Sequence, residues 1–250
     1  MQIDVLDHGY VRLVAHMGED LAVVNAARVS YDKESDSFSE RDGKLLNFLA
    51  KNSHTSPFRH AAFTFELHAP MIVKNQWIKY MVGHDHEDLG AEVSFRDPLF
   101  AWNESSRRYI TETPTFYHPA IKEWREAPAN SKQGSGGFID DPVKAAMLDA
   151  TLKNITQACV EAYEWAMRQG VAPEQARLFL PAYALYIRWR WTASLQGILH
   201  FLDQRLAKDA QLEIALYAQA VESILRELFP NACNAWLGVR DVESVGSTVT

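Results

Sequence analysis

Hydrophobic positions in the first eighty residues change repeatedly between the period of a strand and the period of a helix. The clearest strand covers residues 61–68, where Phe63, Phe65 and Leu67 alternate with polar side chains, as in a strand with one buried face. Asp20 and Ser39 precede helical spacing and are typical N-caps. The predicted elements are a two-stranded hairpin over 5–17, helices over 20–30 and 39–51, a turn over 53–58, a strand over 61–68 and a helix that begins at Pro70.

The second part of the chain begins with weak patterning and then becomes strongly helical. Residues 82–101 have no period and predict an irregular excursion, and the composition of 126–142, which includes SKQGSGG, predicts a mobile loop. Apolar residues at helical spacing run from Pro142 to Arg168, and Gly170 ends that helix. The further predictions are a short helix over 173–180, an aromatic-rich strand over 182–193, helices over 194–204 and 208–228, and a frayed tail over 243–250.

Composition limits the number of domains and the compartment. A chain of 250 residues, 47% of them hydrophobic, can bury one large core, so we expect a single domain over residues 1–250. Two cysteines, Cys159 and Cys233, are too few for a disulfide framework and favour a reducing compartment. The opening MQIDVLDHGYVRLV does not have the pattern of a signal peptide, and no apolar run approaches the roughly 20 residues that cross a bilayer. We therefore expect a cytoplasmic protein, in the host cytoplasm if the source is viral, with no membrane partner.

Net charge argues against one class of partner. The chain carries a formal net charge of −7 and has a pI near 5.7. Binding to a nucleic-acid polymer depends on clustered Lys and Arg, so we expect no such partner. A mononucleotide remains compatible with this charge.

Four arginines in apolar or structured surroundings are the most informative polar residues. They are Arg107 and Arg108 after WNESS, Arg177 within QARLFLP, and Arg205 at the end of ILHFLDQR. A guanidinium group offers a fixed fork of donors that suits a phosphate or a uracil edge, and it stays charged when partly buried. One such arginine is more often an ion-pair partner than a ligand, but four together point to an anionic ligand.

Several other motifs give weaker signals. The run His84–Asp88 has metal-ligand atoms but no second, separated ligand pair, so a solvated charge run is favoured and no metal is predicted. Cys159 is expected to be a buried, inert thiol on a helix, and Cys233 has no Cys-His arrangement. Trp189 and Trp191 are interpreted as sheet packing. Because the sequence has neither GxGxxG nor GxxxxGK[ST], it predicts neither a Rossmann dinucleotide site nor a P-loop.

Dispersed sequence blocks carry the strongest functional signal. They are IDVLDHGYVRLVAHMGEDLAVVNAARVSYD, HTSPFRHAAFTFELHAP, NQW, WNESSRRY, VAPEQARLFLPAYALY, WTASLQGILHFLDQRL and AQLEIALYA. In this order, and over nearly the whole chain, they resemble the flavin-dependent thymidylate synthase family. The resemblance implies an α/β (α+β) fold, with a twisted mixed β-sheet flanked by helices, and a homotetramer with shared active sites. It also implies methylation of dUMP to dTMP, with FAD as cofactor and with NADPH and methylenetetrahydrofolate as cosubstrates.

The resemblance assigns a binding site for dUMP, residue by residue. Its members are Gln76, Glu104, Ser105, Ser106, Arg107, Arg108, Arg177 and Arg205. Arg205 matches the arginine at the uracil edge and is the expected catalytic residue, because a fixed positive charge there stabilises ionisation at N3 and enriches C5. This activation needs no cysteine nucleophile. Without the resemblance, Glu104 is interpreted as a salt-bridge partner of Arg107 or Arg108, and Gln76 as a surface amide.

The resemblance also assigns a binding site for FAD, and there the sequence departs from the family. The assigned residues are Ser30, His54, Ser56, Lys79, Tyr80, Met81, Glu104, Ser194, Gln196 and His200. The family usually has an Arg-His-Arg triplet in place of Lys79–Met81, and an insertion of about 17 residues follows. Ser194, Gln196 and His200 stand where Asn, Arg and Asn are common. Tyr80 can stack on a ring in place of the histidine, and Arg96 is a candidate for the missing cation.

Two alternatives to dTMP synthesis stay open at the level of the sequence. Remodelled flavin residues beside an intact nucleotide site are compatible with a 5-hydroxymethyl pyrimidine nucleotide as product, formed when water traps the methylene adduct. The absent triplet is compatible with a non-catalytic nucleotide-binding paralogue. The mass of the product would separate the first alternative from dTMP synthesis. Flavin absorbance in the purified protein, if present, would exclude the non-catalytic paralogue.

Overall fold

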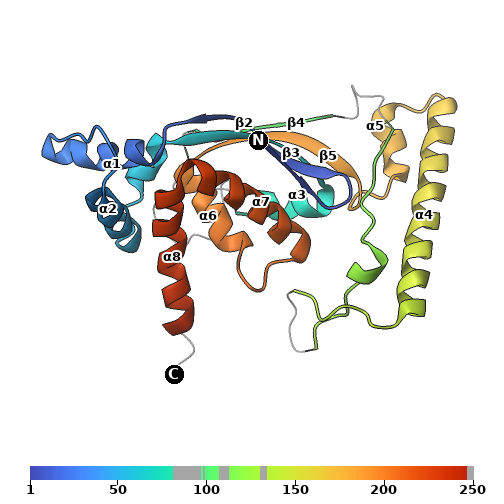
Figure 1. Ribbon diagram of the computed structural model, residues 1–250. Helices are drawn as coiled ribbons and strands as arrows, with labels where there is room; N and C mark the ends of the chain where they lie inside the picture. Colours follow the sequence, from blue (N-terminus) through green and yellow to red (C-terminus); the bar gives the residue numbers. More distant parts are fainter. Residues whose placement is uncertain (81–96, 98, 107–112, 130–133, 247–250) are drawn as a thin grey trace, which may run out of the picture.

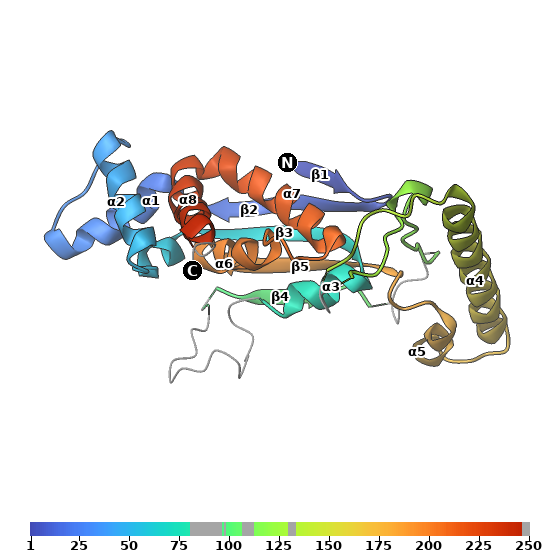
Figure 2. The ribbon, with the colours of Figure 1, turned by 90° about the horizontal axis from the view of Figure 1, so that it is seen from below.

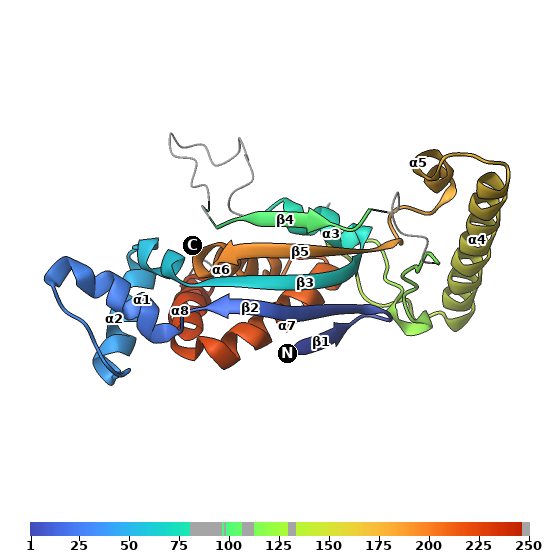
Figure 3. The ribbon, with the colours of Figure 1, turned by 90° about the horizontal axis from the view of Figure 1, so that it is seen from above.

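The computed structural model describes residues 1–80, 97, 99–106, 113–129 and 134–246, with side chains up to residue 238. Its centre is a five-stranded sheet in the order β1-β2-β3-β5-β4 (Figure 3), and every neighbouring pair is antiparallel. The strands are β1 (Gln2–Val5), β2 (Gly9–Met17), β3 (Ala62–Pro70), β4 (Ala101–Glu104) and β5 (Tyr186–Ser194). The predicted fold class is confirmed, although the described strands form an antiparallel sheet and not a mixed one.

The helices connect and cover these strands. The α-helices are α1 (Asp20–Arg28), α2 (Glu40–Lys51), α3 (Met71–Ile78), α4 (Pro142–Arg168), α5 (Pro173–Ala176), α6 (Leu195–Arg205), α7 (Leu212–Leu228) and α8 (Pro230–Gly246). The 3-10 helices are η1 (Val29–Tyr31), η2 (Ser56–His60), η4 (Ile121–Glu123) and η5 (Arg177–Phe179). Two strands run directly into helices, β3 into α3 and β5 into α6. Because these strands are antiparallel, the two helices begin at opposite ends of the strand pair.

One face of the sheet is covered and the other carries no described helix. Figures 1 and 2 show α3, α6, α7 and α8 beneath the strands, and Figure 3 shows the open face. Phe63, Phe65 and Leu67 of β3 are buried on the covered face, as the alternating pattern predicts. On the open face, Glu66 accepts a hydrogen bond from the Tyr10 hydroxyl at 2.9 Å and pairs with arginines of the neighbouring strands.

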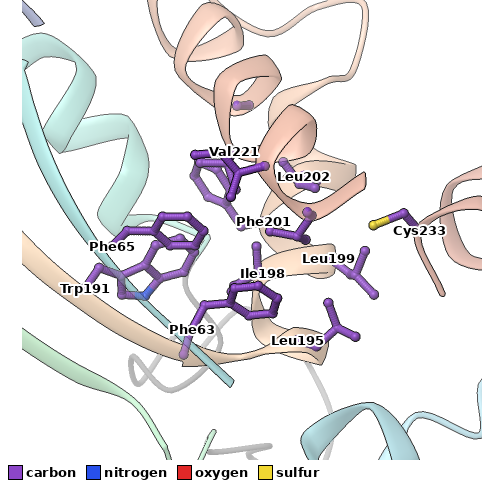
Figure 4. Packing of buried hydrophobic residues seen from close by; sticks show 14 of the residues in the cluster. Phe63, Phe65, Trp191, Leu195, Ile198, Leu199, Phe201, Leu202, Val221 and Cys233 are labelled. Carbon is purple, nitrogen blue, oxygen red and sulfur yellow. The ribbon is translucent and has the colours of Figure 1, made fainter. Parts of the chain in front are cut away.

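The core between the sheet and its helices is rich in aromatic side chains (Figure 4). Trp77 of α3 stacks on Phe201 of α6 with ring centroids 4.3 Å apart and meets Trp189 and Trp191 of β5 edge-on. These four side chains are almost completely inaccessible to solvent. The interpretation of the two β5 tryptophans as packing residues is therefore confirmed, and their packing fixes α3 and α6 next to each other.

Gly9, the first residue of β2, has no room for a side chain. A Cβ atom built on Gly9 would lie 1.8 Å from the Tyr217 hydroxyl and 2.7 Å from the carbonyl oxygen of His68. The Tyr217 hydroxyl donates to that same carbonyl at 2.8 Å. Gly9 therefore lets α7 approach the end of the sheet closely enough to form this hydrogen bond.

Most of the predicted elements are confirmed, with shifted ends. The hairpin, both N-terminal helices, the strand over 61–68 and the helix after Pro70 are all present, and Ser39 is the N-cap of α2. The long helix α4 has the predicted bounds, and Gly170 follows it with a φ of +80°. The aromatic strand begins at Tyr186 and not at residue 182, because residues 182–184 form turns and Leu185 forms an isolated β-bridge with Phe116.

Other predictions were wrong or incomplete. Helix α8 and the short edge strand β4 were not predicted, and α8 includes residues 243–246, which were expected to fray. The N-cap of α1 is Glu19 and not Asp20. Instead, the buried carboxylate of Asp20 accepts hydrogen bonds from the N–H groups of Asn231 and Ala232, at 2.9 and 2.8 Å, because the start of α8 needs acceptors there.

The segment over 126–142 is partly described and contains specific contacts. Glu126 and Gly137 are joined by a 2.9 Å backbone hydrogen bond, and Arg125 forms an isolated β-bridge with Phe138. The described part therefore has backbone pairing, which the composition did not predict. Of the predicted irregular excursion over 82–101, residues 82–96 and 98 lie outside the described residues. Within the described chain, no helix is both long enough and apolar enough to cross a bilayer.

Candidate active site

Arg205, in the last turn of α6, is a charged residue that is only 6% exposed. The guanidinium carbon lies 4.4 Å from the centroid of the Tyr80 ring, and Nη2 donates to the backbone carbonyl oxygen of Gln76 at the end of α3. The structure thus brings together three predicted site residues, one from α6 and two from the C-terminal end of α3.

The charge of Arg205 is held in the protein without a described carboxylate partner. Burial lowers the pKa of Arg205 from its ordinary value, and among the described residues Tyr80 acts in the opposite direction and raises it. Its Nε–H is buried and has no hydrogen-bond partner. A buried guanidinium usually pairs with a carboxylate, because removing its charge from water is costly. Arg205 therefore keeps an unused donor and its positive charge for a ligand.

Strand β4 carries Glu104 and leads to Ser105. Glu104 forms an ion pair with Lys74 of α3. The salt-bridge interpretation of this carboxylate is thus correct in kind, although its described partner is Lys74, and Arg107 and Arg108 lie outside the described residues. Ser105 continues the pairing with β5, since its N–H donates to the carbonyl oxygen of Arg188 at 2.8 Å. Ser106 follows and is half-buried.

The start of α6 is closed by a carboxylate that the sequence did not indicate. Asp97 is buried, and its Oδ2 accepts from the N–H of Ser194 at 2.7 Å, while Oδ1 accepts from the N–H of Leu99 at 3.0 Å. The hydroxyl of Ser194 in turn accepts from the N–H of Gly197 at 3.2 Å. A negative charge at this end is favoured by the helix dipole. Ser194 and Asp97 therefore fix where α6, and the site residues on it, begin.

Gln196 and His200 are half-buried on α6, within one turn of each other. The Nε–H of Arg59, from η2, donates to the side-chain oxygen of Gln196. Arg59 was not among the predicted site residues. Its hydrogen bond brings a guanidinium group to Gln196, the residue of α6 that stands where arginine is common in the family.

The remaining described site residues lie on separate elements. Ser30 is exposed on η1, while His54 and Ser56 are exposed before and at the start of η2. His54 meets the ring of Phe48 at a centroid distance of 5.7 Å. Arg177 is exposed on η5, and its Nε–H donates to the carbonyl oxygen of Glu174 at 3.1 Å.

Arg177 is not brought to Arg205 within one chain. Figures 1, 2 and 3 all show α5, which precedes η5, beside α4 at one end of the molecule, whereas α6 lies under the sheet. Lys79 is exposed just before Tyr80, at the C-cap of α3. Met81, Arg96, Arg107 and Arg108 lie outside the described residues.

Comparison with known proteins identifies the family. The family model described as "Thymidylate synthase complementing protein" matches residues 12–231. The chain is 37% identical over 236 residues to the flavin-dependent thymidylate synthase of Thermus thermophilus, covering 94% of this chain and 78% of that protein. It is 33% identical over 237 residues to the enzyme of the same name from Thermosipho africanus, covering 95% and 94%.

The chain belongs to the family of flavin-dependent thymidylate synthases. The resemblance stated from the sequence is therefore confirmed, and the chain is a flavin-dependent enzyme. A solved structure, the UMP/dUMP methylase PolB from Streptomyces cacaoi bound with 5-Br dUMP, matches with a TM-score of 0.74 and 25% identity, covering 94% of this chain and 97% of that one.

The two cysteines of the chain differ in exposure. Cys233 is buried in the core, and burial raises the pKa of its thiol to about 12. A thiol with such a pKa is not a nucleophile at neutral pH. Cys159 is half-buried on α4, so the expectation of a buried thiol was wrong for this residue, because α4 presents much of its surface to solvent.

No group of three or more metal-ligand side chains gathers within the described part of the chain. His84–Asp88, the run that was weighed as a metal site, lies outside it. The interpretation of that run as a solvated charge run stays a prediction.

Proposed function

We propose that the chain methylates dUMP at C5 to give dTMP, with FAD as cofactor, methylenetetrahydrofolate as carbon donor and NADPH as reductant. The observation that carries this proposal is the buried guanidinium group of Arg205, which has no described carboxylate partner and retains a free Nε–H. The names of the relatives support the same reaction class.

Arg205 is proposed to lie at the uracil edge of dUMP. In a site of low polarity, its charge would stabilise the negative charge that develops at N3 and the adjoining carbonyl oxygen. Electron density at C5 then rises, and C5 can attack the one-carbon unit without addition of a cysteine to the ring. The high pKa of the Cys233 thiol is in accord with this route.

The residues around α6 fit a flavin, which when bound supplies the hydride that completes the methyl group. Tyr80 offers an aromatic ring that is 41% exposed, and Arg59 brings a positive charge to Gln196. The Tyr80 ring and the Arg59 charge would partly replace the aromatic ring and the positive charges of the Arg-His-Arg triplet, which this chain does not have. The proposed flavin residues are those assigned from the sequence, namely Ser30, His54, Ser56, Lys79, Tyr80, Met81, Glu104, Ser194, Gln196 and His200, with Arg59 added.

The phosphate and sugar of dUMP are proposed to contact Ser105, Ser106, Arg107, Arg108 and Arg177, with Gln76 and Glu104 nearby. Because α5 and α6 lie apart in one chain, Arg177 would come from a second copy. This separation supports the shared active sites that we propose, and the number of four copies in the proposed homotetramer rests on the resemblance to the family. Exposed apolar side chains on α4 and η5 support the assembly, among them Trp165 at 55% and Leu178 at 81% exposure.

The test is an assay of the purified protein with dUMP, methylenetetrahydrofolate, NADPH and FAD, followed by mass spectrometry of the nucleotide. We expect dTMP as the product and flavin absorbance in the protein as isolated. UMP serves as a competing substrate, because the solved relative is described as a UMP/dUMP methylase. A protein that binds flavin and forms no dTMP contradicts the proposal, and a nucleotide with the mass of 5-hydroxymethyl-dUMP assigns the reaction to the hydroxymethylating alternative.

A matched pair of variants links the activity to Arg205. Arg205→Met removes the charge and is expected to lower kcat by about a hundredfold or more. Arg226→Met removes an exposed arginine of α7, which pairs with Glu222, and is expected to leave kcat unchanged. Equal activity of both variants would show that Arg205 has no part in the chemistry.

A further inference from the structure

Tyr80 and Arg205 form a contact that the assignment of Tyr80 to the flavin does not explain. The guanidinium carbon lies 4.4 Å from the ring centroid, a distance at which a cation is attracted to the electron-rich face of an aromatic ring. Tyr80 follows the end of α3, where its N–H donates to the carbonyl oxygen of Trp77 at 3.3 Å. The ring is therefore attached to the same turn of backbone that accepts the Nη2–H of Arg205 at Gln76.

The chemical nature of these two contacts matters more than their strength. A carboxylate beside the guanidinium group would orient it and also cancel its charge. An aromatic face and a backbone carbonyl orient it while leaving a full positive charge. Among the described residues, Arg205 has only the second kind of contact.

The base of this arrangement is rigid. Trp77, one turn before Tyr80, is fully buried and stacks on Phe201, which lies one turn before Arg205 on α6. The spacing between the ends of α3 and α6 is thus set by core packing, and the Tyr80–Arg205 pair lies one turn further along both segments. The Nε–H of Arg205 remains without a partner at this end.

We propose that Tyr80 is a positioning residue for the nucleotide: its ring holds the Arg205 guanidinium group in the orientation that meets the uracil edge while leaving its charge uncompensated. This inference rests on the proposed function, because it takes the ligand of Arg205 to be the uracil ring. It gives Tyr80 a role toward the nucleotide in addition to any contact with the flavin.

The test compares Tyr80→Leu with Tyr80→Phe in the flavin-loaded protein. Leucine removes the aromatic face, whereas phenylalanine keeps it and removes only the hydroxyl. We expect Tyr80→Leu to weaken dUMP binding by about tenfold, the scale of a partly desolvated cation–ring contact, and Tyr80→Phe to stay within about twofold of the wild type. Binding is measured by calorimetry, and thermal melting and flavin absorbance check that both variants fold.

A second ligand and a spectroscopic readout separate positioning from a general loss of structure. 2′-Deoxyribose 5-phosphate has the sugar and phosphate of dUMP but no uracil, so its affinity is expected to be unchanged in Tyr80→Leu. The pH at which bound dUMP ionises at N3, followed by difference absorbance, is expected to lie below that of free dUMP in the wild type and in Tyr80→Phe. In Tyr80→Leu it is expected to move back toward the value of free dUMP.

The outcomes are distinguishable. If the wild type binds no dUMP, the proposed function fails, and this inference fails with it. If the wild type binds and ionises dUMP and Tyr80→Leu does so equally well, the proposed function stands and the inference is overturned. It is also overturned if Tyr80→Leu weakens dUMP and 2′-deoxyribose 5-phosphate to the same extent, because the effect then does not pass through the uracil edge.

Discussion

Asp42 shows how single residues hold the segment between α1 and α2. Its carboxylate is fully buried, pairs with Arg28 at 2.5 Å and accepts from the N–H and hydroxyl of Ser39 at 2.7 and 2.6 Å. Burial by itself raises the pKa of Asp42, but the hydrogen bonds from Ser39 and the charge of Arg28 outweigh it, so the pKa lies below its ordinary value. The ionised form is therefore the one that stabilises the fold.

Replacement of Asp42 by Asn should destabilise the protein at neutral pH by about 3 kcal/mol, because Arg28 loses its buried partner. A carboxyl whose pKa is lower in the folded chain contributes its full stability above the unfolded pKa, and this contribution is lost as the pH falls through the folded pKa. The difference between wild type and Asp42→Asn should thus narrow below about pH 4. Urea unfolding at several pH values measures it.

The exposed Asp36 supplies the control for this experiment. Asp36→Asn should change the free energy of unfolding by less than about 0.5 kcal/mol at any of these pH values. A loss of stability in Asp42→Asn that stays constant from pH 7 to pH 3 would contradict the role given to the ionised carboxylate.

Sequence reasoning at this scale succeeded for local roles and failed for distant ones. Ser39 was predicted as a cap from its residue type and its place before helical spacing, and its partner, Asp42, is only three residues away. Asp20 was wrongly predicted as the N-cap of the first helix, and Asp97 was missed, because their partners, at the starts of α8 and α6, are far along the chain. Arg59 could have been found only by asking which cation replaces the one absent at Gln196.

At the scale of elements, Asp97 and Gly197 join the segment before β4 to the first turn of α6. A Cβ atom at position 197 would lie 2.8 Å from Oδ2 of Asp97. Gly197→Ala should therefore displace that carboxylate and lower the free energy of unfolding by about 1–3 kcal/mol. Gly43→Ala in α2 is the matched control, since nothing lies within 4 Å of its added Cβ.

Because alanine favours a helix over glycine, Gly43→Ala should stabilise the protein by about 0.5–1 kcal/mol. Chemical denaturation of the two variants, with flavin content as a second readout, checks the predicted loss of stability in Gly197→Ala and the predicted gain in Gly43→Ala. Equal stability of Gly197→Ala and wild type would mean that Asp97 does not occupy the start of α6 in solution.

The contact between η2 and α6 allows a test in which a charge is moved. If Arg59 replaces the cation that the family carries at position 196, Arg59→Gln should weaken FAD binding by about tenfold, the scale of one charge-assisted hydrogen bond. Adding Gln196→Arg to that variant should restore the affinity, and Arg59→Lys should retain most of it. FAD fluorescence titration gives the affinities.

In the opposite case, Arg59→Gln binds FAD as tightly as the wild type, and the cation near the flavin must come from another residue. The double variant guards against a trivial explanation, because a variant that has merely lost its fold is not rescued by a second substitution on α6.

Elements with a long or regular pattern were predictable, and short or interrupted ones were not. The 27 residues of α4 repeat their apolar spacing many times, so its bounds could be predicted. Strand β4 has four residues and owes its pairing to the edge of β5, which no local pattern reveals. Helix α8 begins at a proline directly after α7, and the sequence analysis ended the helical region there.

The arrangement of the whole molecule leaves two features without a function in a single chain. Helix α4 stands at one end, apart from the sheet (Figure 1), and exposes an apolar stripe at helical spacing that consists of Val143, Met147, Ile155 and Trp165. Arg177, on the neighbouring η5, donates to the carbonyl oxygen of Glu174 and forms no hydrogen bond or ion pair with a described residue of α6. Both features follow if the α4–η5 end packs against a second copy and delivers Arg177 to the Arg205 of that copy.

Mixing two inactive variants tests this arrangement. Arg177→Ala and Arg205→Met should each lose most of the dTMP-forming activity. If each site takes Arg177 from one copy and Arg205 from another, random reassembly of an equal mixture restores about a quarter of the sites to a complete set. The mixture should therefore regain about a quarter of the wild-type activity after the subunits are exchanged under mild denaturant, with unmixed variants treated in the same way as controls.

The double variant Arg177→Ala with Arg205→Met, mixed with wild type, separates this result from simple dilution. There too, sites that combine a wild-type Arg177 with a wild-type Arg205 form at about a quarter of the total after random exchange, whereas without sharing between copies half of the activity remains. A mixture of single variants that stays inactive, while sedimentation shows that subunits have exchanged, means that both arginines of a site belong to one chain. In that case the α4–η5 end would have to move toward α6 within a single molecule.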